Sequence, residues 1–414
     1  MKRIYLCLAH MSEAGLEQKY IKEAFDTNWV VPLGPNVNAF EQDLESFVGE
    51  GKSVVALSSG TAAIHLALLA CNVKSGDEVI VQDFTFSASA NPVCYIGATP
   101  VFVDSEYGSW NMDPNLLDIA IRDRIKKTGK IPKAVIPVAL YGMPYNIDAI
   151  MEVAEQYGIP IVEDAAEGFG SKWKGRMLGT FGRYGVLSFN GNKMITTSGG
   201  GGLVCPDVEA KRQIMWLATQ AREAYPYYQH RAIGYNYRMS NICAGIGRGQ
   251  MSIVEDHIAH HKHIQQLYEE GFRNATGITV HSNPTEAYDA NYWLCTLLID
   301  EDLRVKGQEI AYQSEVSGAV GGAGATVHRS NSTHTDCEPN INVEALRVWL
   351  DKCGIESRPL WKPMHKQPVF KQAPAYVNGV SESMFKKGIC LPSGPMVSDD
   401  DVAYIIQCIK NAIE

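Results

Sequence analysis

The 414-residue sequence has no excess of positive charge, no closely spaced pair of cysteines and no long apolar run. Its 37 Lys and Arg residues are outnumbered by 46 Asp and Glu residues, and the net charge of −9 argues against a nucleic-acid or anionic-membrane partner. The ten cysteines are scattered singly, as in cytosolic proteins that use cysteine as a small apolar residue. No apolar stretch approaches the roughly 18–20 residues that span a bilayer, and the N-terminal apolar run is too short for a signal peptide. We therefore expect a cytoplasmic protein.

Short β-branched runs alternate with amphipathic stretches between residues 53 and 204. The runs predict strands over 53–57, 77–82, 99–104, 133–140, 159–164, 185–190 and 201–206, and helices over 61–73, 85–97 and 146–158. This alternation favours a parallel or mixed sheet with helices on both faces, in which ligands bind beyond the carboxyl ends of the strands. Residues 206–275 are expected to be mostly helical and residues 276–414 to form a smaller α+β segment. Within the latter, the Gly-, Ser- and Thr-rich stretch 314–336 is expected to be a flexible loop or insertion.

A first polar motif, "SSGT", follows the strand predicted at 53–57 and precedes a helix. Gly60 would let the backbone approach an anion, and the hydroxyl of Thr61 adds a donor near the positive end of the helix dipole. The motif is equally consistent with an ordinary N-capped helix.

Two acids, Glu163 and Asp164, end another predicted strand. Successive side chains point to opposite sides of a strand, so only one of them can face a bound ligand. A carboxylate there can hold a protonated ring nitrogen, although an acid that caps the following turn is an alternative.

Lys193 lies in the stretch "SFNGNKMITTSGGGG". It could clamp a phosphate, stand solvated in a loop or serve as a reactive amine. The P-loop pattern does not fit, because Met194 follows the lysine and the required glycines are missing. A lysine beside buried strands can be desolvated and nucleophilic, although a solvated loop lysine is commoner in general.

These three motifs indicate a specific ligand only when they are taken together. A phosphate cradle, a carboxylate for a pyridine nitrogen and a nucleophilic lysine are the three anchors that pyridoxal 5′-phosphate (PLP) needs. An aromatic ring against the pyridine face is also expected, and Phe84 or Phe86 could supply it, although core packing is the usual role of phenylalanine.

At these residues the sequence resembles the sugar aminotransferases of the DegT/DnrJ/EryC1/StrS family over nearly its whole length. The matching blocks include "SSGTAAIHLAL", "TFSASANPV", "VEDAAEGFGS", "GVLSFNGNKMITTSGGGG", "IGYNYRMSN" and "ESRPLWKPMH". The resemblance implies the α/β fold of fold-type I PLP transferases, like aspartate aminotransferase, with a large mixed-sheet α/β/α domain and a smaller α+β C-terminal domain. We place an N-terminal segment at 1–30, the large PLP-binding domain at 31–255 and the small domain at 256–414.

The resemblance also implies roles for individual residues. Lys193 would form the imine with the cofactor and move protons, and Asp164 would pair with the pyridine nitrogen. Glu167 would lie near the ring hydroxyl of the cofactor, at a position more often occupied by Gln or His in the wider family. Asn236 would reach the phosphate from the other subunit of a homodimer. The remaining expected contacts are Gly60, Thr61 and Ser188 to the phosphate, Phe86 to the ring, and Arg358, Trp361, Lys362 and His365 near the substrate.

The activity implied is transfer of the amino group of L-glutamate to C4 of a nucleotide-linked 4-keto-6-deoxy sugar of UDP-N-acetyl type, for surface polysaccharide or glycan synthesis. A sugar dehydratase of the same fold is one alternative, which Lys193 disfavours because those enzymes carry histidine there. A non-catalytic cofactor- or sugar-binding regulator is another.

Two further motifs are given structural interpretations. In "EDHIAHHKH", His257 and His261 stand at helical spacing for a metal, but a solvated or interface helix face is the expected interpretation and no metal is predicted. The basic cluster in "SKWKGR" (171–176) could approach an anionic diphosphate, but a surface hairpin is the expected interpretation.

Overall fold

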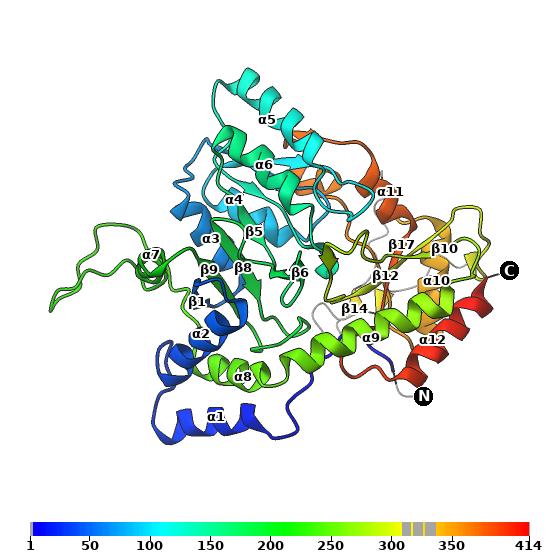
Figure 1. Ribbon diagram of the computed structural model, residues 1–414, viewed down its shortest axis with the longest axis horizontal. Helices are drawn as coiled ribbons and strands as arrows, with labels where there is room; N and C mark the ends of the chain where they lie inside the picture. Colours follow the sequence, from blue (N-terminus) through cyan, green and yellow to red (C-terminus); the bar gives the residue numbers. More distant parts are fainter. Residues whose placement is uncertain (1–2, 309–315, 318–325, 328–336, 414) are drawn as a thin grey trace.

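The computed structural model describes residues 3–308, 316–317, 326–327 and 337–413. Its centre is a mixed β-sheet built from two hydrogen-bonded halves (Figure 1). In order, the first half is β1 (Ser53–Leu57), β9 (Gly201–Cys205), β8 (Tyr184–Ser188) and β5 (Val162–Asp164), and the second is β4 (Val135–Ile136), β2 (Glu78–Gln82), β3 (Thr99–Val103) and β16 (Ala375–Tyr376). Parallel bridges from Val135 to Ile161 and from Val138 to Asp164 join the halves. Strand β9 runs antiparallel to both β1 and β8.

Helices cover both faces of this sheet, because its strands are apolar on both sides. Along β1, Val54 and Ala56 join one buried cluster, and Val55 and Leu57 join another. The first cluster includes side chains of α2 (Pro35–Val48), α5 (Pro114–Thr128), α6 (Ile147–Tyr157) and α8 (Asn241–Met251), and the second includes those of α3 (Gly60–Ala70), α4 (Asn91–Tyr95) and α7 (Val208–Ala218). Helix α1 (Leu16–Asp26) packs on α8. The predicted α/β class is confirmed.

Two elements are shorter than the sequence predicted. The helix expected over 85–97 is a 3₁₀ turn, η1 (Ser87–Ser89), followed by α4, in which Pro92 takes an early position. Proline is tolerated in the first turn of a helix but not in its interior, so the helix begins here rather than before it. The strand expected over 133–140 is continuous only at Val135–Ile136, with one further bridge at Val138, and the chain then turns through η2 (Leu140–Gly142) around Tyr141, whose φ is 55°.

The C-terminal part forms an antiparallel sheet of its own, on the right in Figure 1. Its strands, in order, are β10 (Ile278–Val280), β12 (Cys295–Ile299), β17 (Gly388–Leu391) and β15 (Arg358–Pro359). A third buried cluster lies between this sheet and α9 (Val254–Phe272), α10 (Ile341–Lys352) and α12 (Asp399–Ala412), and α11 (Val380–Lys387) leads into β17. Within 314–336, β13 (Val316–Ser317) pairs with β14 (Thr326–Val327), and the other residues of the predicted insertion lie outside the described residues.

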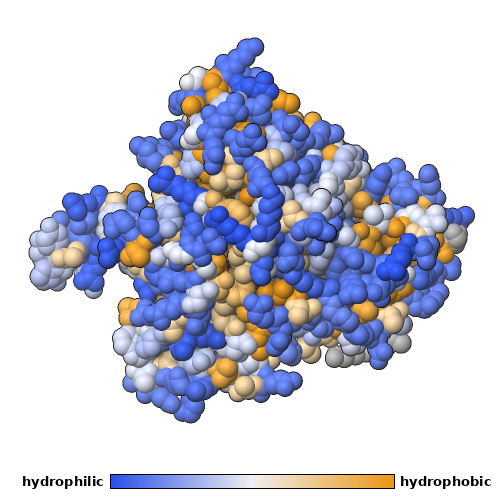
Figure 2. All heavy atoms as spheres, in the orientation of Figure 1, coloured by the Kyte–Doolittle hydropathy of each residue, from blue (hydrophilic) through white to orange (hydrophobic). Residues whose placement is uncertain are grey.

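Residues 219–236 form an arm that extends away from the body beside α7 (Figures 1 and 2). Antiparallel bridges join Thr219 to Asn236 at its base and Arg222 to His230 farther out. Residues 206–275 were expected to be mostly helical, which α7, α8 and α9 confirm, and the arm is the non-helical stretch within that range. Its large exposed apolar side chains are Tyr225, Tyr227, Tyr228 and Ile233. In the described part of the chain, every helix is too short or too polar to cross a membrane.

Candidate active site

Lys193 lies in the loop after β8, and its side chain is 14% exposed. Its Nζ is 3.3 Å from Oε1 of Glu167 and 3.9 Å from the centre of the Trp293 ring. The amine is therefore enclosed between a carboxylate and an aromatic face rather than solvated. A lysine in such surroundings can serve as a nucleophile and as a proton carrier.

Asp164, at the end of β5, is buried and lies near enough to Lys193 to feel its charge. Its Oδ2 accepts a hydrogen bond of 2.7 Å from the Ser89 hydroxyl, and Oδ1 accepts one from the backbone N–H of Ala166. Burial raises the pKa of Asp164, while the Ser89 hydrogen bond and the charge of Lys193 lower it. Glu163 instead accepts backbone hydrogen bonds from Phe181 and Gly182. The alternation expected along this strand thus separates the two acids.

Glu167 is the second carboxylate beside Lys193. Its Oε2 accepts a 2.7 Å hydrogen bond from the backbone N–H of Tyr141, and Oε1 faces the lysine amine. Burial raises the pKa of Glu167, and the nearby charge of Lys193 acts in the opposite direction. The Asn291 amide donates to the main-chain oxygen of Glu167, so the backbone of this residue is fixed as well.

The start of α3 meets the end of β8 at a close approach of two backbones. A Cβ at Gly60 would lie 3.3 Å from Cβ of Ser188 and 3.4 Å from the Leu187 carbonyl oxygen. The side chain of Ser59 accepts a hydrogen bond from the Ala62 N–H and so caps the helix, as one interpretation of the sequence expected. The first backbone N–H groups of a helix have no partner within it, so this end of α3 presents donors suited to an anion beside the Ser188 side chain.

The two candidate phenylalanines have different environments. Phe84 is fully buried in the core, whereas Phe86 is 52% exposed. The ring of Phe86 lies 5.3 Å from that of Trp361, and Trp361 in turn stacks on Tyr141 at 6.0 Å. The backbone N–H of Trp361 also donates to the Tyr141 hydroxyl. Phe86 is therefore the one of the two that can contact a ligand, with Trp361 beside it.

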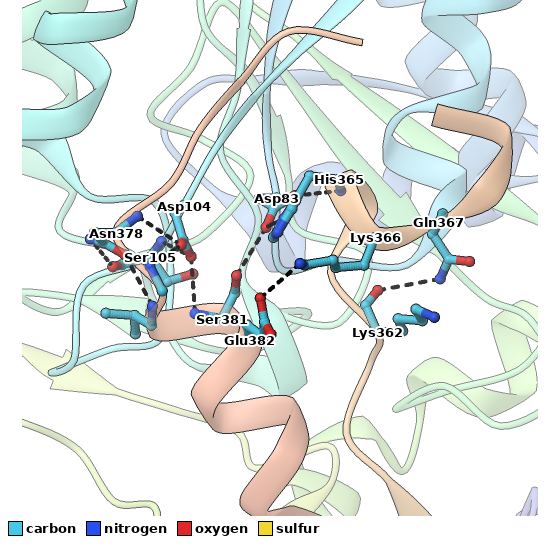
Figure 3. Close-up of polar contacts among 12 residues, drawn as sticks. Asp83, Asp104, Ser105, Lys362, His365, Lys366, Gln367, Asn378, Ser381 and Glu382 are labelled. Carbon is cyan, nitrogen blue, oxygen red and sulfur yellow. Dashed lines mark hydrogen bonds and ion pairs between the residues drawn. The ribbon is translucent and has the colours of Figure 1, made fainter. Parts of the chain in front are cut away.

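His365 is bound to the end of β2 by a buried carboxylate (Figure 3). The Asp83 side chain accepts hydrogen bonds from the His365 Nδ1 over 2.7 Å, from the His365 backbone N–H over 2.8 Å and from the Ser381 hydroxyl over 2.9 Å. Burial alone would lower the pKa of His365, but the hydrogen bond and charge of Asp83 outweigh it and raise that pKa. At the end of β3, Asp104 similarly accepts backbone N–H groups of Asn378, Gly379 and Ser381. Two acids of the large sheet thus hold segment 361–381.

The other expected substrate residues lie on the same segment or next to it. Arg358 stands opposite Cys390 in the small sheet and donates to Glu356. The main-chain oxygen of Lys362 accepts from the Gln367 side chain (Figure 3). Asn236 is exposed at the base of the arm.

The histidines of α9 correct one prediction. This helix face was expected to be solvated or at an interface; the solvated alternative is wrong for His257 and His261, which are buried on the side of α9 that faces the lysine loop. Their Nδ1 atoms lie 3.0 Å from the Met194 carbonyl oxygen and 3.1 Å from that of Tyr292. Within the described residues no group of three or more metal-type ligands occurs. The predicted hairpin at 171–176 is confirmed as β6 (Lys172–Trp173) and β7 (Arg176–Met177), and β6 also pairs with β11 (Tyr288–Asp289).

Four residues of the site were missed in the sequence: Ser89, Tyr141, Asn291 and Trp293. Ser89 lies within the block "TFSASANPV" and was a visible candidate as a hydroxyl near a strand end. Asn291 and Trp293 are far from the lysine in the chain, and hydrogen bonds of Asn291 to Glu167 and of Trp293 to Asn192 hold them at the site.

The model of the DegT/DnrJ/EryC1/StrS aminotransferase family matches residues 12–335 and 319–410. The chain belongs to this family. It is 42% identical to EpsN of Bacillus subtilis (strain 168), named as a pyridoxal phosphate-dependent aminotransferase, over 99% of this chain and 95% of that one. It is 33% identical to the GDP-perosamine synthase of Escherichia coli O157:H7, over 98% of each chain.

Solved structures agree with the fold. A DegT/DnrJ/EryC1/StrS aminotransferase from Brucella abortus superposes with a TM-score of 0.81 at 27% identity, over 96% of this chain and 95% of that one. The protein is therefore a fold-type I, PLP-dependent sugar aminotransferase of nucleotide-sugar and polysaccharide biosynthesis. The side chains described above are of the kinds that such a cofactor needs: an enclosed amine, a buried carboxylate and anion donors at a helix start.

Proposed function

We propose that this aminotransferase moves the amino group of L-glutamate to C4 of a nucleotide-linked 4-keto-6-deoxy sugar, of UDP-N-acetyl type, and that Lys193 is its reactive amine. The observation that carries the assignment is the position of Lys193 Nζ, which is enclosed between Glu167 and Trp293. When bound, PLP supplies an aldehyde that accepts an amine and a ring that withdraws electrons from the bond being broken.

The other residues of the site orient and hold protons around this amine. Asp164, with the Ser89 hydroxyl fixing one of its oxygens, would keep a ring nitrogen protonated through a charge-assisted hydrogen bond. The Nζ of Lys193 would take a proton from the carbon of the amino donor and deliver it to the aldehyde carbon of the cofactor. Such general acid–base catalysis is typically worth about 10²–10⁴-fold in rate. Glu167 would hold the protonated amine between these steps. Gly60, Thr61 and Ser188 would bind the phosphate.

The substrate side is proposed from the segment held by Asp83 and Asp104. Phe86 would stack on the cofactor ring; Trp361 lies beside Phe86, and His365, on the same segment as Trp361, is fixed by Asp83. Arg358 and Lys362 add positive charge for an anionic substrate, which suits the diphosphate of a nucleotide sugar. The GDP-perosamine synthases among its relatives make GDP sugars the competing substrate class.

We also propose a cytoplasmic homodimer with shared sites, in which the arm carries Asn236 toward the phosphate site of the partner. The backbone N–H of Ser58, next to the start of α3, donates to the Tyr237 carbonyl. The base of the arm therefore lies beside the helix start that is proposed to bind the phosphate. The exposed tyrosines of the arm are suited to burial against a second copy.

The test pairs one variant with a substrate panel. Lys193→Ala should abolish turnover and the absorbance near ~420 nm that this cofactor chemistry gives. A variant that transaminates at the wild-type rate would refute the assignment. Wild-type protein, glutamate and a panel of UDP-, dTDP- and GDP-linked 4-keto sugars, analysed by mass spectrometry, should give a 4-amino product with UDP-linked substrates. Products found only with GDP- or dTDP-sugars would overturn the nucleotide assignment.

A further inference from the structure

Trp293 lies directly under the amine of Lys193. The centroid of its ring is 3.9 Å from Nζ, and the tryptophan is only 2% exposed. A cation over the face of an indole is attracted by the ring quadrupole, and the attraction grows when water is excluded. Glu167 lies on the amine as well, with Oε1 at 3.3 Å. The charged form of the amine thus has two partners of different kinds.

The indole is fixed so that it can act as a platform. Its Nε1 donates a 2.6 Å hydrogen bond to the carbonyl oxygen of Asn192, the residue before Lys193. Its own backbone N–H donates to the Asn291 side chain, and its carbonyl accepts from the Ser393 hydroxyl. One side chain therefore holds both the backbone of the lysine loop and the tip of the lysine.

The segment that carries Trp293 also holds the opposite side of the site. The Asn291 amide donates to the carbonyl oxygens of Glu167 and Phe169, each over 2.9 Å. The ring Nδ1 of His261 lies 3.1 Å from the Tyr292 carbonyl oxygen. Burial lowers the pKa of His261 to about 3, so this ring is neutral near pH 7 and can donate from Nδ1 to the carbonyl. Residues 291–293 thus set the spacing between Lys193 and Glu167.

We propose that Trp293 is a positioning residue that holds the Lys193 ammonium on its indole face whenever that amine is not bonded to cofactor. This inference rests on the proposed role of Lys193. In each catalytic cycle the lysine must be released and must return, and a fixed place for the released amine keeps it within reach of the same atoms.

The test follows the reactivity of the amine in full-length, cofactor-free protein. Wild type, Trp293→Phe and Trp293→Leu are treated with an amine-reactive reagent over a range of pH, and labelling of the Lys193 peptide is quantified by mass spectrometry. Only the uncharged amine reacts, so loss of the ring should move the labelling midpoint of Trp293→Leu to lower pH by about half a unit to one unit. Trp293→Phe keeps a weaker aromatic face and should move it less, in the same direction. Trp110→Leu, which removes a buried tryptophan stacked on His281, is the control and should leave the midpoint unchanged.

The outcomes separate this inference from the proposed function. Borohydride trapping of added PLP on Lys193 tests the function, and failure of trapping in wild type would refute it. If trapping succeeds while the labelling midpoint stays at the wild-type pH in both Trp293 variants, the positioning role alone is overturned. If Trp293→Leu does not fold, as judged by circular dichroism, a midpoint unchanged in Trp293→Phe overturns it equally.

Discussion

The hydroxyl of Ser89 donates a 2.7 Å hydrogen bond to Oδ2 of Asp164, across the gap between η1 and the end of β5. The Thr85 hydroxyl lies 2.8 Å from that of Ser89, so the contact belongs to a short buried chain of hydroxyl groups. Because this hydrogen bond lowers the pKa of a carboxyl whose burial raises it, Ser89 helps to keep Asp164 ionised.

Ser89→Ala should therefore weaken catalysis without removing it. Loss of one hydrogen bond to a buried charge raises the pKa of Asp164 further and should lower kcat/KM by roughly ten-fold. The acidic limb of the pH–rate profile should move to higher pH. Ser87→Ala in the same turn is the matched control, and an equal loss in both variants would contradict the specific role of Ser89.

Gly60→Ala should weaken cofactor binding. The new Cβ would lie 3.3 Å from Cβ of Ser188, so the helix start and the strand end must move apart at the proposed phosphate site. We expect the Kd for PLP to rise about ten-fold, equivalent to about 1.4 kcal/mol, as measured by absorbance titration. Gly199 has open space where its Cβ would stand, and Gly199→Ala should leave the Kd unchanged.

The raised pKa of the buried Glu163 side chain predicts that the stability of the fold depends on pH. Burial raises its pKa to about 7, with the backbone N–H groups of Gly179, Phe181 and Gly182 acting against the rise. The pKa of Glu163 is higher in the folded protein (about 7) than in the unfolded chain (4.5). Its protonated side chain therefore contributes fully to the free energy of unfolding below about pH 4.5, and this contribution is lost as the pH rises through 7.

Glu163→Gln should accordingly be stabilising at pH 8, by roughly 2–3 kcal/mol, and nearly neutral at pH 5. Urea unfolding at the two pH values measures this difference. The exposed Glu152→Gln on α6 is the control, and a Glu163→Gln effect that is the same at both pH values would rule out the raised pKa.

Shared sites predict complementation between two defective variants. Lys193→Ala and Asn236→Ala chains, co-expressed at equal levels, should recover about a quarter of wild-type activity, because half of the dimers are hybrids with one intact site. Each variant alone should remain inactive or strongly impaired. No recovery in hybrids proven by two affinity tags would show that Asn236 does not act across subunits.

Much of this site could be predicted from the sequence because its main polar residues and its glycine lie at or after the ends of strands. Asp164, Lys193 and Gly60 all come directly after apolar runs, and parallel strands bring their carboxyl ends to one edge. The histidines of α9 could not be judged in this way, because helical spacing does not tell which side of the helix is buried. Trp293 and His365 depend on contacts across more than 90 residues of chain, with Asn192 and Asp83 respectively, for which local patterns carry no signal.

The route of the chain through β16 limits how the protein can be divided. After β15 the chain leaves the small sheet, binds Asp83 through His365, adds Ala375–Tyr376 in parallel beside β3 and only then returns as β17. A fragment that stops near residue 255 would lose the strand that covers β3 and would expose an unpaired sheet edge. Separately expressed halves should therefore aggregate, and they should recover as a soluble complex only when produced together.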